Sequence, residues 1–217
     1  MAKYKLVIFD WDGTLMDTVE RIVTSLQAAA KTISLTPPSL EEGKSIIGLS
    51  LYNVVRQLYP DTTDHIRRKF EQEYKHQYLH VNNTPTPLFN NALSLLIRLK
   101  EHDVLIAVAT GKAREGLNRV LKVSDTKYLF DATRTASECE SKPDPDMITS
   151  LLAELNVEAA DAVMIGDTSF DMEMAKNANV DRIGVTLGAH SEEVLNRYEP
   201  IAIVHSFTEL EQILIPI

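Results

Sequence analysis

Two aspartates, Asp10 and Asp12, flank a single tryptophan directly after an apolar stretch, in the order Phe-Asp-Trp-Asp-Gly-Thr-Leu. An unperturbed aspartate has a pKa of about 3.9, so we expect Asp10 to be ionised at neutral pH and able to act as a nucleophile without a separate base. Asp12 is close enough on the same loop to reach the oxygen of a leaving group. Its carboxyl group could serve first as a general acid and then as a general base.

Three later segments carry groups that suit a phosphoryl group. Thr110 ends an apolar run and is followed by Gly111, so the hydroxyl and the next backbone amides can point at phosphate oxygens. Lys142, which a proline follows, offers a compact positive charge. Asp167 and Asp171 share the segment Ile-Gly-Asp-Thr-Ser-Phe-Asp. Taken singly, each aspartate could instead cap a turn or helix, Thr110 could be a helix N-cap, and Lys142 could be a solvated surface lysine.

Other short motifs do not explain these segments. A calcium-binding EF-hand needs glycine at its sixth position and glutamate at its twelfth, whereas Gly13 is fourth from Asp10 and the twelfth residue is Arg21. The chain contains neither a Walker A motif nor a Gly-x-Gly-x-x-Gly loop, and its six histidines include no His-Glu-x-x-His spacing. The usual P-loop, dinucleotide and zinc sites are therefore excluded.

Short apolar, β-branched runs precede the chemical segments and alternate with helical periodicity. This alternation predicts an α/β fold with a Rossmann-like parallel sheet and helices on both faces. Open sheets of this type bind ligands at the carboxyl ends of their strands, which is where the four segments would lie. Strands are expected at 5–9, 104–109, 162–165, 182–185 and 201–204, and crossover helices at 88–100 and 145–155.

Residues 17–83 contain helical patterns and no convincing strand, at 18–32, 40–47, 51–58 and 66–79. Prolines at the exit discourage continuation of a helix. We therefore expect an α-helical cap at 17–83, inserted into an α/β catalytic core formed by 1–16 and 84–217. Gly48, Leu49 and Ser50 interrupt the helical pattern of the cap, and this turn could reach the leaving group and select the substrate. A plain interhelical turn is the alternative.

Composition restricts the partners. A chain of 217 residues, 44% hydrophobic, is long enough for one compact domain with an insertion. The net charge of −9 and the lack of Lys and Arg clusters argue against nucleic acid. No apolar run approaches the roughly 18 residues of a membrane span, and a single cysteine, Cys139, excludes an internal disulfide. A cytoplasmic protein is expected, and the oligomeric state stays open.

In this order and spacing, the four segments resemble the haloacid dehalogenase-like hydrolase superfamily, from residue 5 to about residue 210. The cap type and the sequence Gly-Val-Thr-Leu-Gly at 184–188 look like the branch that contains phosphoglycolate phosphatases and β-phosphoglucomutases. The resemblance implies a Mg²⁺ ion held by the carboxylate of Asp10, the backbone carbonyl of Asp12 and the carboxylate of Asp167. It also implies a supporting role for Asp171 beside Lys142 and the metal.

The activity that this resemblance implies is Mg²⁺-dependent hydrolysis of a small, phosphoglycolate-like phosphomonoester through an aspartyl-phosphate on Asp10. Asp12 argues against phosphonate-cleaving relatives, which resemble Phe-Asp-Trp-Ala-Gly-Thr here, and against dehalogenases, which need no acid at this position. Thr14 favours a phosphatase over a phosphomutase of the β-phosphoglucomutase type, which is the nearest alternative. A non-catalytic protein that binds a phosphorylated ligand is the alternative from another class.

Three other residues, which lie in or near these segments, have less specific interpretations. Trp11 could contact the cap but is expected to pack in the core, because indole is mostly apolar. Lys112 is interpreted as a solvated surface lysine. Asn179 stands where relatives tend to have glycine, and asparagine can adopt the same left-handed backbone.

Overall fold

The computed structural model describes residues 2–216 and contains a six-stranded sheet in the order β3-β2-β1-β4-β5-β6. All neighbouring strands are parallel. The central strand β1 (Leu6–Phe9) lies between β2 (Leu105–Thr110) and β4 (Ala162–Gly166), and every residue of β1 and β4 is buried. Continuous apolar runs are typical of parallel strands that are covered on both faces.

The outer strands are β3 (Ala132–Thr135), β5 (Asp181–Val185) and β6 (Ala202–Val204). Five of the six strands fall on the predicted runs. The prediction missed β3, whose sequence Ala-Thr-Arg-Thr is short and polar. This strand is the sheet edge beside β2, so it has only one strand neighbour and does not need an apolar run.

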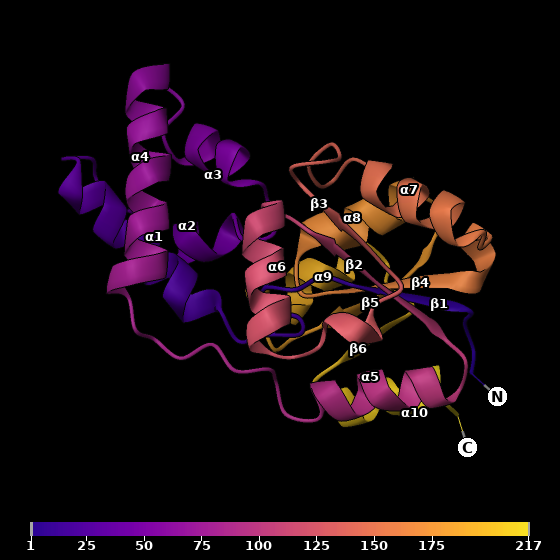
Figure 1. Ribbon diagram of the computed structural model, residues 1–217. Coiled ribbons are helices and arrows are strands. Elements are labelled where there is room, and N and C mark those ends of the chain that lie inside the picture. The colour runs from indigo at the N-terminus through magenta and orange to yellow at the C-terminus, as the bar shows by residue number, and fades with distance from the viewer. Residues whose placement is uncertain (1, 217) are drawn as a thin grey trace.

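Helices cover both faces of the sheet, which confirms the predicted fold class (Figure 1). On one face, α5, α6 and α10 pack against Val7 and Phe9, and on the other α7 and α8 pack against Leu6 and Ile8. The helices outside the cap are α5 (Ala92–Glu101), α6 (Arg114–Val123), α7 (Asp146–Leu155), α8 (Ser169–Asn177), α9 (Glu192–Asn196) and α10 (Phe207–Leu214), with 3₁₀ turns η2 (Lys127–Leu129) and η3 (Ala159–Asp161).

The cap has its own apolar core, which includes Leu26, Val55 and Phe70. Figure 1 shows its indigo and purple helices beside the sheet. In the sequence, these helices come after β1 and before α5. Its elements are α1 (Val19–Thr32), α2 (Leu40–Ser45), α3 (Leu51–Leu58), α4 (Asp64–His76) and the π-helix η1 (Gln77–Val81).

The two chain segments that connect cap and core lie side by side. The backbone N–H of Asp17 donates to Pro87, the N–H of Phe89 donates to Leu15, and Met16 forms an antiparallel bridge with Leu88. This pairing explains why the predicted helix 88–100 begins only at residue 92.

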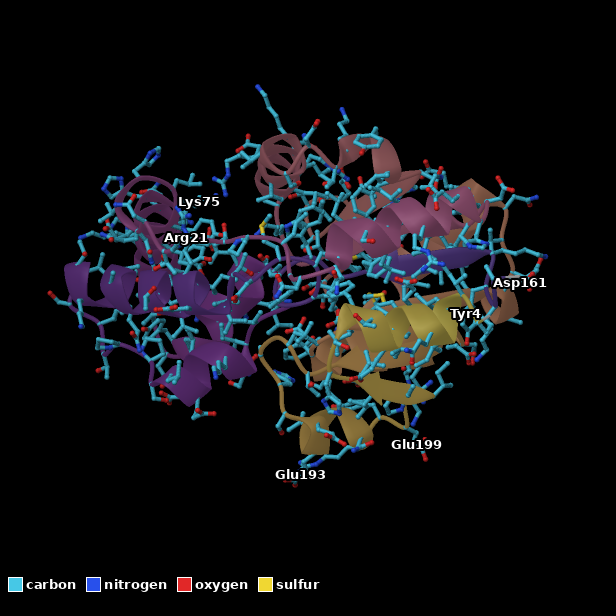
Figure 2. All side chains as sticks on the ribbon, turned by 90° about the horizontal axis from the view of Figure 1, so that it is seen from below. Tyr4, Arg21, Lys75, Asp161, Glu193 and Glu199 are labelled. Atoms are coloured by element: carbon cyan, nitrogen blue, oxygen red, sulfur yellow. The ribbon has the colours of Figure 1, made fainter. Side chains whose placement is uncertain are left out.

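The cap lies over the carboxyl ends of the strands. Tyr4 and Asp161 precede β1 and β4 and therefore mark the amino ends of the sheet. Figure 2 shows them at the opposite end of the molecule from Arg21 and Lys75, which belong to the cap. Within residues 2–216, no helix combines the length and the apolar character needed to cross a membrane.

Candidate active site

Asp10 is the first residue after β1, and its backbone N–H donates to Ile165 of β4 at 2.9 Å. Its side chain is buried, and within residues 2–216 neither carboxylate oxygen has a hydrogen-bond partner. Lys142 Nζ lies 2.9 Å from Asp10 Oδ1, an ion pair without the alignment of a hydrogen bond.

The pKa of Asp10 is raised to about 7, mainly because the side chain is buried. The positive charge of Lys142 opposes this rise, and the negative charge of Asp171 adds to it. The expectation of an ionised Asp10 rests on the unperturbed pKa, which is lower than the pKa of Asp10 in the folded protein without a metal. The unperturbed pKa ignores the loss of hydration in a buried site. A cation beside Asp10 would favour the carboxylate again.

Lys142 is buried between two carboxylates, which excludes its interpretation as a solvated surface lysine. Besides Asp10, its ammonium contacts Asp171 Oδ1 at 2.6 Å. Burial alone would lower the pKa of Lys142, but the charges of Asp10 and Asp171 outweigh it and raise the pKa above its usual range. Lys142 therefore remains charged and neutralises part of the acidic cluster.

Asp171 is held in the first turn of α8. Its Oδ2 accepts hydrogen bonds from the N–H and the hydroxyl of Thr168, at 3.0 and 2.6 Å, while its Oδ1 accepts from Lys142. Thr168 in turn caps the helix by accepting from the N–H of Asp171. Both oxygens of Asp171 thus have protein partners, an arrangement that suits support of neighbouring groups.

Asp167 follows β4 and is buried. Its Oδ1 accepts a hydrogen bond from Thr14 at 2.7 Å, and its Oδ2 accepts one from the N–H of Ala189 at 2.8 Å. Burial and the charges of Asp171 and Asp10 raise the pKa of Asp167 well above its ordinary value. The two hydrogen bonds oppose this rise and fix the orientation of the carboxylate.

Asp10, Asp167 and Asp171 can each place one oxygen within 4.8 Å of the others. Hard carboxylate oxygens are the ligands that Mg²⁺ prefers. The orphaned oxygens of Asp10 and the repulsion among three buried carboxylates are what a divalent cation would relieve. The residues present therefore fit the magnesium ion that the resemblance implies. Of these three carboxylates, only that of Asp10 has oxygens without hydrogen-bond partners within residues 2–216, whereas both oxygens of Asp167 and of Asp171 already accept hydrogen bonds from the protein.

Asp12 is paired with a lysine that the sequence analysis interpreted wrongly. Lys112 Nζ lies 2.7 Å from both carboxylate oxygens of Asp12, and the two side chains are only 10% and 12% exposed. The backbone N–H of Lys112 donates to Thr110 Oγ1 at 3.3 Å. Its position two residues after Thr110, in the loop leaving β2, was the available signal that it faces the site rather than solvent.

The turn of the cap reaches the loop after β2. Gly48 has a φ of +99°, which favours glycine, and Ser50 caps α3 through its hydroxyl. The N–H of Ser50 donates to Ser141 Oγ of the core at 3.2 Å. A Cβ atom at Gly111 would lie 2.6 Å from the carbonyl oxygen of Leu49 and closer still to that of Gly48. Cap and core are thus in direct backbone contact here.

A cavity of about 510 Å³ lies under this contact. Of the predicted site residues, it brings together Asp10, Asp12, Thr110, Gly111, Gly48, Leu49 and Ser50, while Lys142, Asp167 and Asp171 lie behind Asp10 and are not part of its lining. Trp11 is fully buried and packs against Phe130, with ring centroids 5.9 Å apart, so the prediction of core packing is confirmed.

The cavity also contains residues that the sequence analysis did not single out, namely Tyr74, Tyr78 and Arg119. Arg119 stands four residues after Glu115 on α6, about one helical turn, and both residues line the cavity. That spacing was visible in the sequence, but helix α6 itself was not predicted. The tyrosines belong to the cap, where no chemical motif marks them.

Comparison with known proteins agrees with this fold. Residues 7–185 match the family model of haloacid dehalogenase-like hydrolases. The chain is 32% identical to "Probable phosphatase IndB" of Dickeya dadantii, over 94% of this chain and 91% of that protein. It is 26% identical to a phosphoglycolate phosphatase of Psychrobacter arcticus, over 95% and 94% of the two chains.

A crystal structure titled "Putative haloacid dehalogenase-like hydrolase", from Bacteroides fragilis, superposes with a TM-score of 0.88 at 26% identity, over 96% of this chain and 100% of that one. The chain therefore belongs to the haloacid dehalogenase-like hydrolase family. Within that family it is a phosphatase, a phosphoric monoester hydrolase that resembles the phosphoglycolate phosphatases.

Proposed function

We propose that the protein is a Mg²⁺-dependent phosphatase that hydrolyses a small, phosphoglycolate-like phosphomonoester through an aspartyl-phosphate on Asp10. The observation that carries the proposal is the state of the Asp10 carboxylate. It lines the cavity, is buried, and has no hydrogen bond within residues 2–216, although Lys142 lies 2.9 Å away. The Oδ2 of Asp10 has neither a hydrogen bond nor an ion pair within residues 2–216, so it retains its electron pairs for attack on phosphorus.

In the first step, an oxygen of Asp10 forms a bond to phosphorus while the bond between phosphorus and the ester oxygen breaks. Asp12 acts here in its protonated form, released from its ion pair with Lys112, and donates its proton to that departing oxygen. In the second step, a water oxygen bonds to phosphorus, Asp12 accepts the proton of the water, and the bond from phosphorus to Asp10 breaks. Inorganic phosphate and the free alcohol are the products, and both aspartates return to their starting states.

The remaining groups hold the phosphoryl oxygens. The hydroxyl of Thr110 and the backbone amide after it, at Gly111, donate hydrogen bonds, and the ammonium of Lys142 adds a fixed positive charge. Magnesium held by the carboxylates of Asp10 and Asp167 and the backbone carbonyl of Asp12 would screen the repulsion between nucleophile and phosphate. Asp171 keeps Lys142 in place, as their 2.6 Å contact supports.

The two parts of the chain would bind different parts of the substrate. We assign the phosphoryl group and the metal to the core, residues 1–16 and 84–217, and the leaving group to the cap, residues 17–83. The turn of Gly48, Leu49 and Ser50 lines the same cavity as Asp10, which supports a role in choosing the substrate. The proposed partner is a soluble phosphorylated metabolite, and a single cysteine suits a cytoplasmic enzyme.

The test is phosphate release from a panel of phosphorylated metabolites, with and without Mg²⁺, by the wild type and Asp10→Asn. We expect release only from the wild type with metal, because the asparagine amide cannot form the acyl phosphate. Thermal unfolding of both proteins verifies that the variant is folded. Wild-type turnover by Asp10→Asn would contradict the proposal. Formation of an isomeric sugar phosphate in place of free phosphate would favour the phosphomutase alternative.

A further inference from the structure

One end of the cavity carries polar groups that the proposed chemistry does not use. Tyr74 in α4 and Tyr78 in η1 are four residues apart, and their ring centroids lie 5.9 Å from each other. Arg119 of α6 places its guanidinium carbon 5.6 Å from the centre of the Tyr78 ring. All three side chains line the cavity, two from the cap and one from the core.

These groups have no polar partners within residues 2–216. Neither tyrosine hydroxyl takes part in a hydrogen bond, and Arg119 forms no hydrogen bond or ion pair. Two acids, Glu71 and Glu115, line the same cavity, yet neither is within ion-pair distance of Arg119. A guanidinium offers five N–H donors, so a half-buried arginine without an acceptor is prepared for an anion.

Arg21 lies near the same ring as Arg119 but has a structural role, because it donates hydrogen bonds to backbone carbonyl oxygens. It also lies over the Tyr78 ring, at 4.9 Å, but donates to the carbonyl oxygen of Tyr78 at 2.7 and 3.2 Å and to that of Thr84 at 3.3 Å. These bonds hold the π-helical turn that contains Tyr78. Short π segments are frequent at functional sites, and this one keeps Tyr78 buried against the cavity.

Arg119 lies near Asp12, one of the proposed reacting groups, because both are close to Lys112 and Tyr78. Lys112, which pairs with Asp12, lies over the same Tyr78 ring at 5.6 Å. The positive end of the cavity is therefore on the side of Asp12, where the leaving group departs. The lining of the cavity also includes apolar side chains, among them Ile22, Leu26 and Val54. A cavity of about 510 Å³ is within the range that encloses drug-sized ligands, and a two-carbon ester would fill little of it.

We propose that Arg119 and the hydroxyls of Tyr74 and Tyr78 bind an anionic group at the far end of the leaving group. The substrate class is then a phosphate ester whose alcohol has an apolar middle longer than two carbons and ends in a carboxylate or a second phosphate. This assignment rests on the proposed phosphatase function and replaces the two-carbon, phosphoglycolate-like ester with a longer ester that also ends in an anionic group. Cap and core contribute jointly to the subsite, so the anion is bound when the cap is closed.

The test compares ω-phosphonooxy alkanoic acids of two to six carbons with their primary amides, which differ only in the terminal charge. A second set pairs alkanediol bisphosphates with the monophosphates and separates a phosphate terminus from a carboxylate. We expect kcat/KM of the wild type to favour the anion by about tenfold or more, the usual effect of a charged hydrogen bond. The preference should be largest for chains longer than two carbons.

Arg119→Gln should reduce the ratio between acid and amide to less than about threefold, and Arg119→Lys should keep part of it. Lys122→Gln is the matched control, because it removes an exposed cation from the same helix outside the cavity and should leave the ratio unchanged. An equal loss for acid and amide in Arg119→Gln would show a purely structural role and overturn the proposal. Equal wild-type rates for acid and amide would overturn it as well.

Binding measurements separate this proposal from the proposed function. Calorimetry on Asp10→Asn needs no turnover, and the acid should bind about tenfold more tightly than the amide, with the difference lost in Asp10→Asn/Arg119→Gln. If the wild type hydrolysed no ester, including 4-nitrophenyl phosphate, the phosphatase function would fail while calorimetry still decided the subsite. Equal affinities for acid and amide would refute the subsite alone.

Discussion

Gly111→Ala is the substitution that most directly probes the contact between cap and core. The added methyl carbon would lie 2.6 Å from the carbonyl oxygen of Leu49 and closer still to that of Gly48. The backbone of Gly111 does not have a positive φ, so alanine fits the local conformation. The amide that we assign to phosphate binding is also retained. The clash with the cap turn is therefore the main consequence.

The size of the effect follows from the overlap. Non-bonded heavy atoms prefer separations of roughly 3.5 Å, so the turn of the cap must retreat by about 1 Å. A misplacement of about 1 Å in a catalytic assembly can cost roughly 10²-fold in rate. We expect kcat/KM of Gly111→Ala to fall by about that factor. The core strands remain packed, so the melting temperature should stay near that of the wild type.

The assay is steady-state phosphate release with the best substrate of the panel, together with thermal unfolding. Gly116→Ala is the matched control: Gly116 lines the same cavity, but the nearest atom to its added carbon is Lys112 Cβ at 4.0 Å, so the methyl group meets no clash. Alanine in this helix should preserve activity and raise the free energy of unfolding by about 0.5–1 kcal/mol. Full activity of Gly111→Ala would refute the reasoning that this cap turn must contact the core during turnover.

Three further changes test other parts of the site. Asp12→Ala should slow turnover at least about 10²-fold, with the larger loss for poor leaving groups; equal losses for good and poor leaving groups would contradict its role as an acid. Substitutions at Leu49 and Ser50 should change relative kcat/KM among substrates while Mg²⁺ affinity is retained, and a uniform change would place specificity elsewhere. Lys142→Met should lower the free energy of unfolding at neutral pH by about 3 kcal/mol, because it leaves Asp10 and Asp171 buried without their cation. That loss should diminish toward acid pH, where protonation removes the carboxylate charges, and a loss independent of pH in denaturant titrations would argue against this cause.

The central strands could be predicted from the sequence because both faces of the sheet are covered. Burial on two sides requires an uninterrupted apolar run, and the predictions for β1 and β4 differ from the structure by at most one residue at an end. The edge strand β3 has no such requirement and was missed. Asn179 has a φ of +55°, which confirms the left-handed backbone expected where relatives carry glycine.

Side-chain pairing was harder to predict than the backbone. Four motifs at strand ends indicated a common site, since parallel strands end at one edge of the sheet. The partner of Asp12 was not identified, because a lysine in a loop is ordinarily solvated and Lys112 becomes buried only under the cap. The pKa of Asp10 could not be predicted either, because it depends on burial and on distances to Lys142 and Asp171 that only the folded chain fixes.

Detection of the covalent intermediate tests the central claim most directly. Asp12→Ala is mixed with substrate and Mg²⁺, quenched in acid and analysed by intact mass and peptide mapping. We expect one added phosphoryl group, located on Asp10 and released by hydroxylamine, and none when Asp10→Asn is combined with the same variant. A phosphoryl group on another residue, or steady turnover by Asp10→Asn alone, would contradict nucleophilic attack by Asp10.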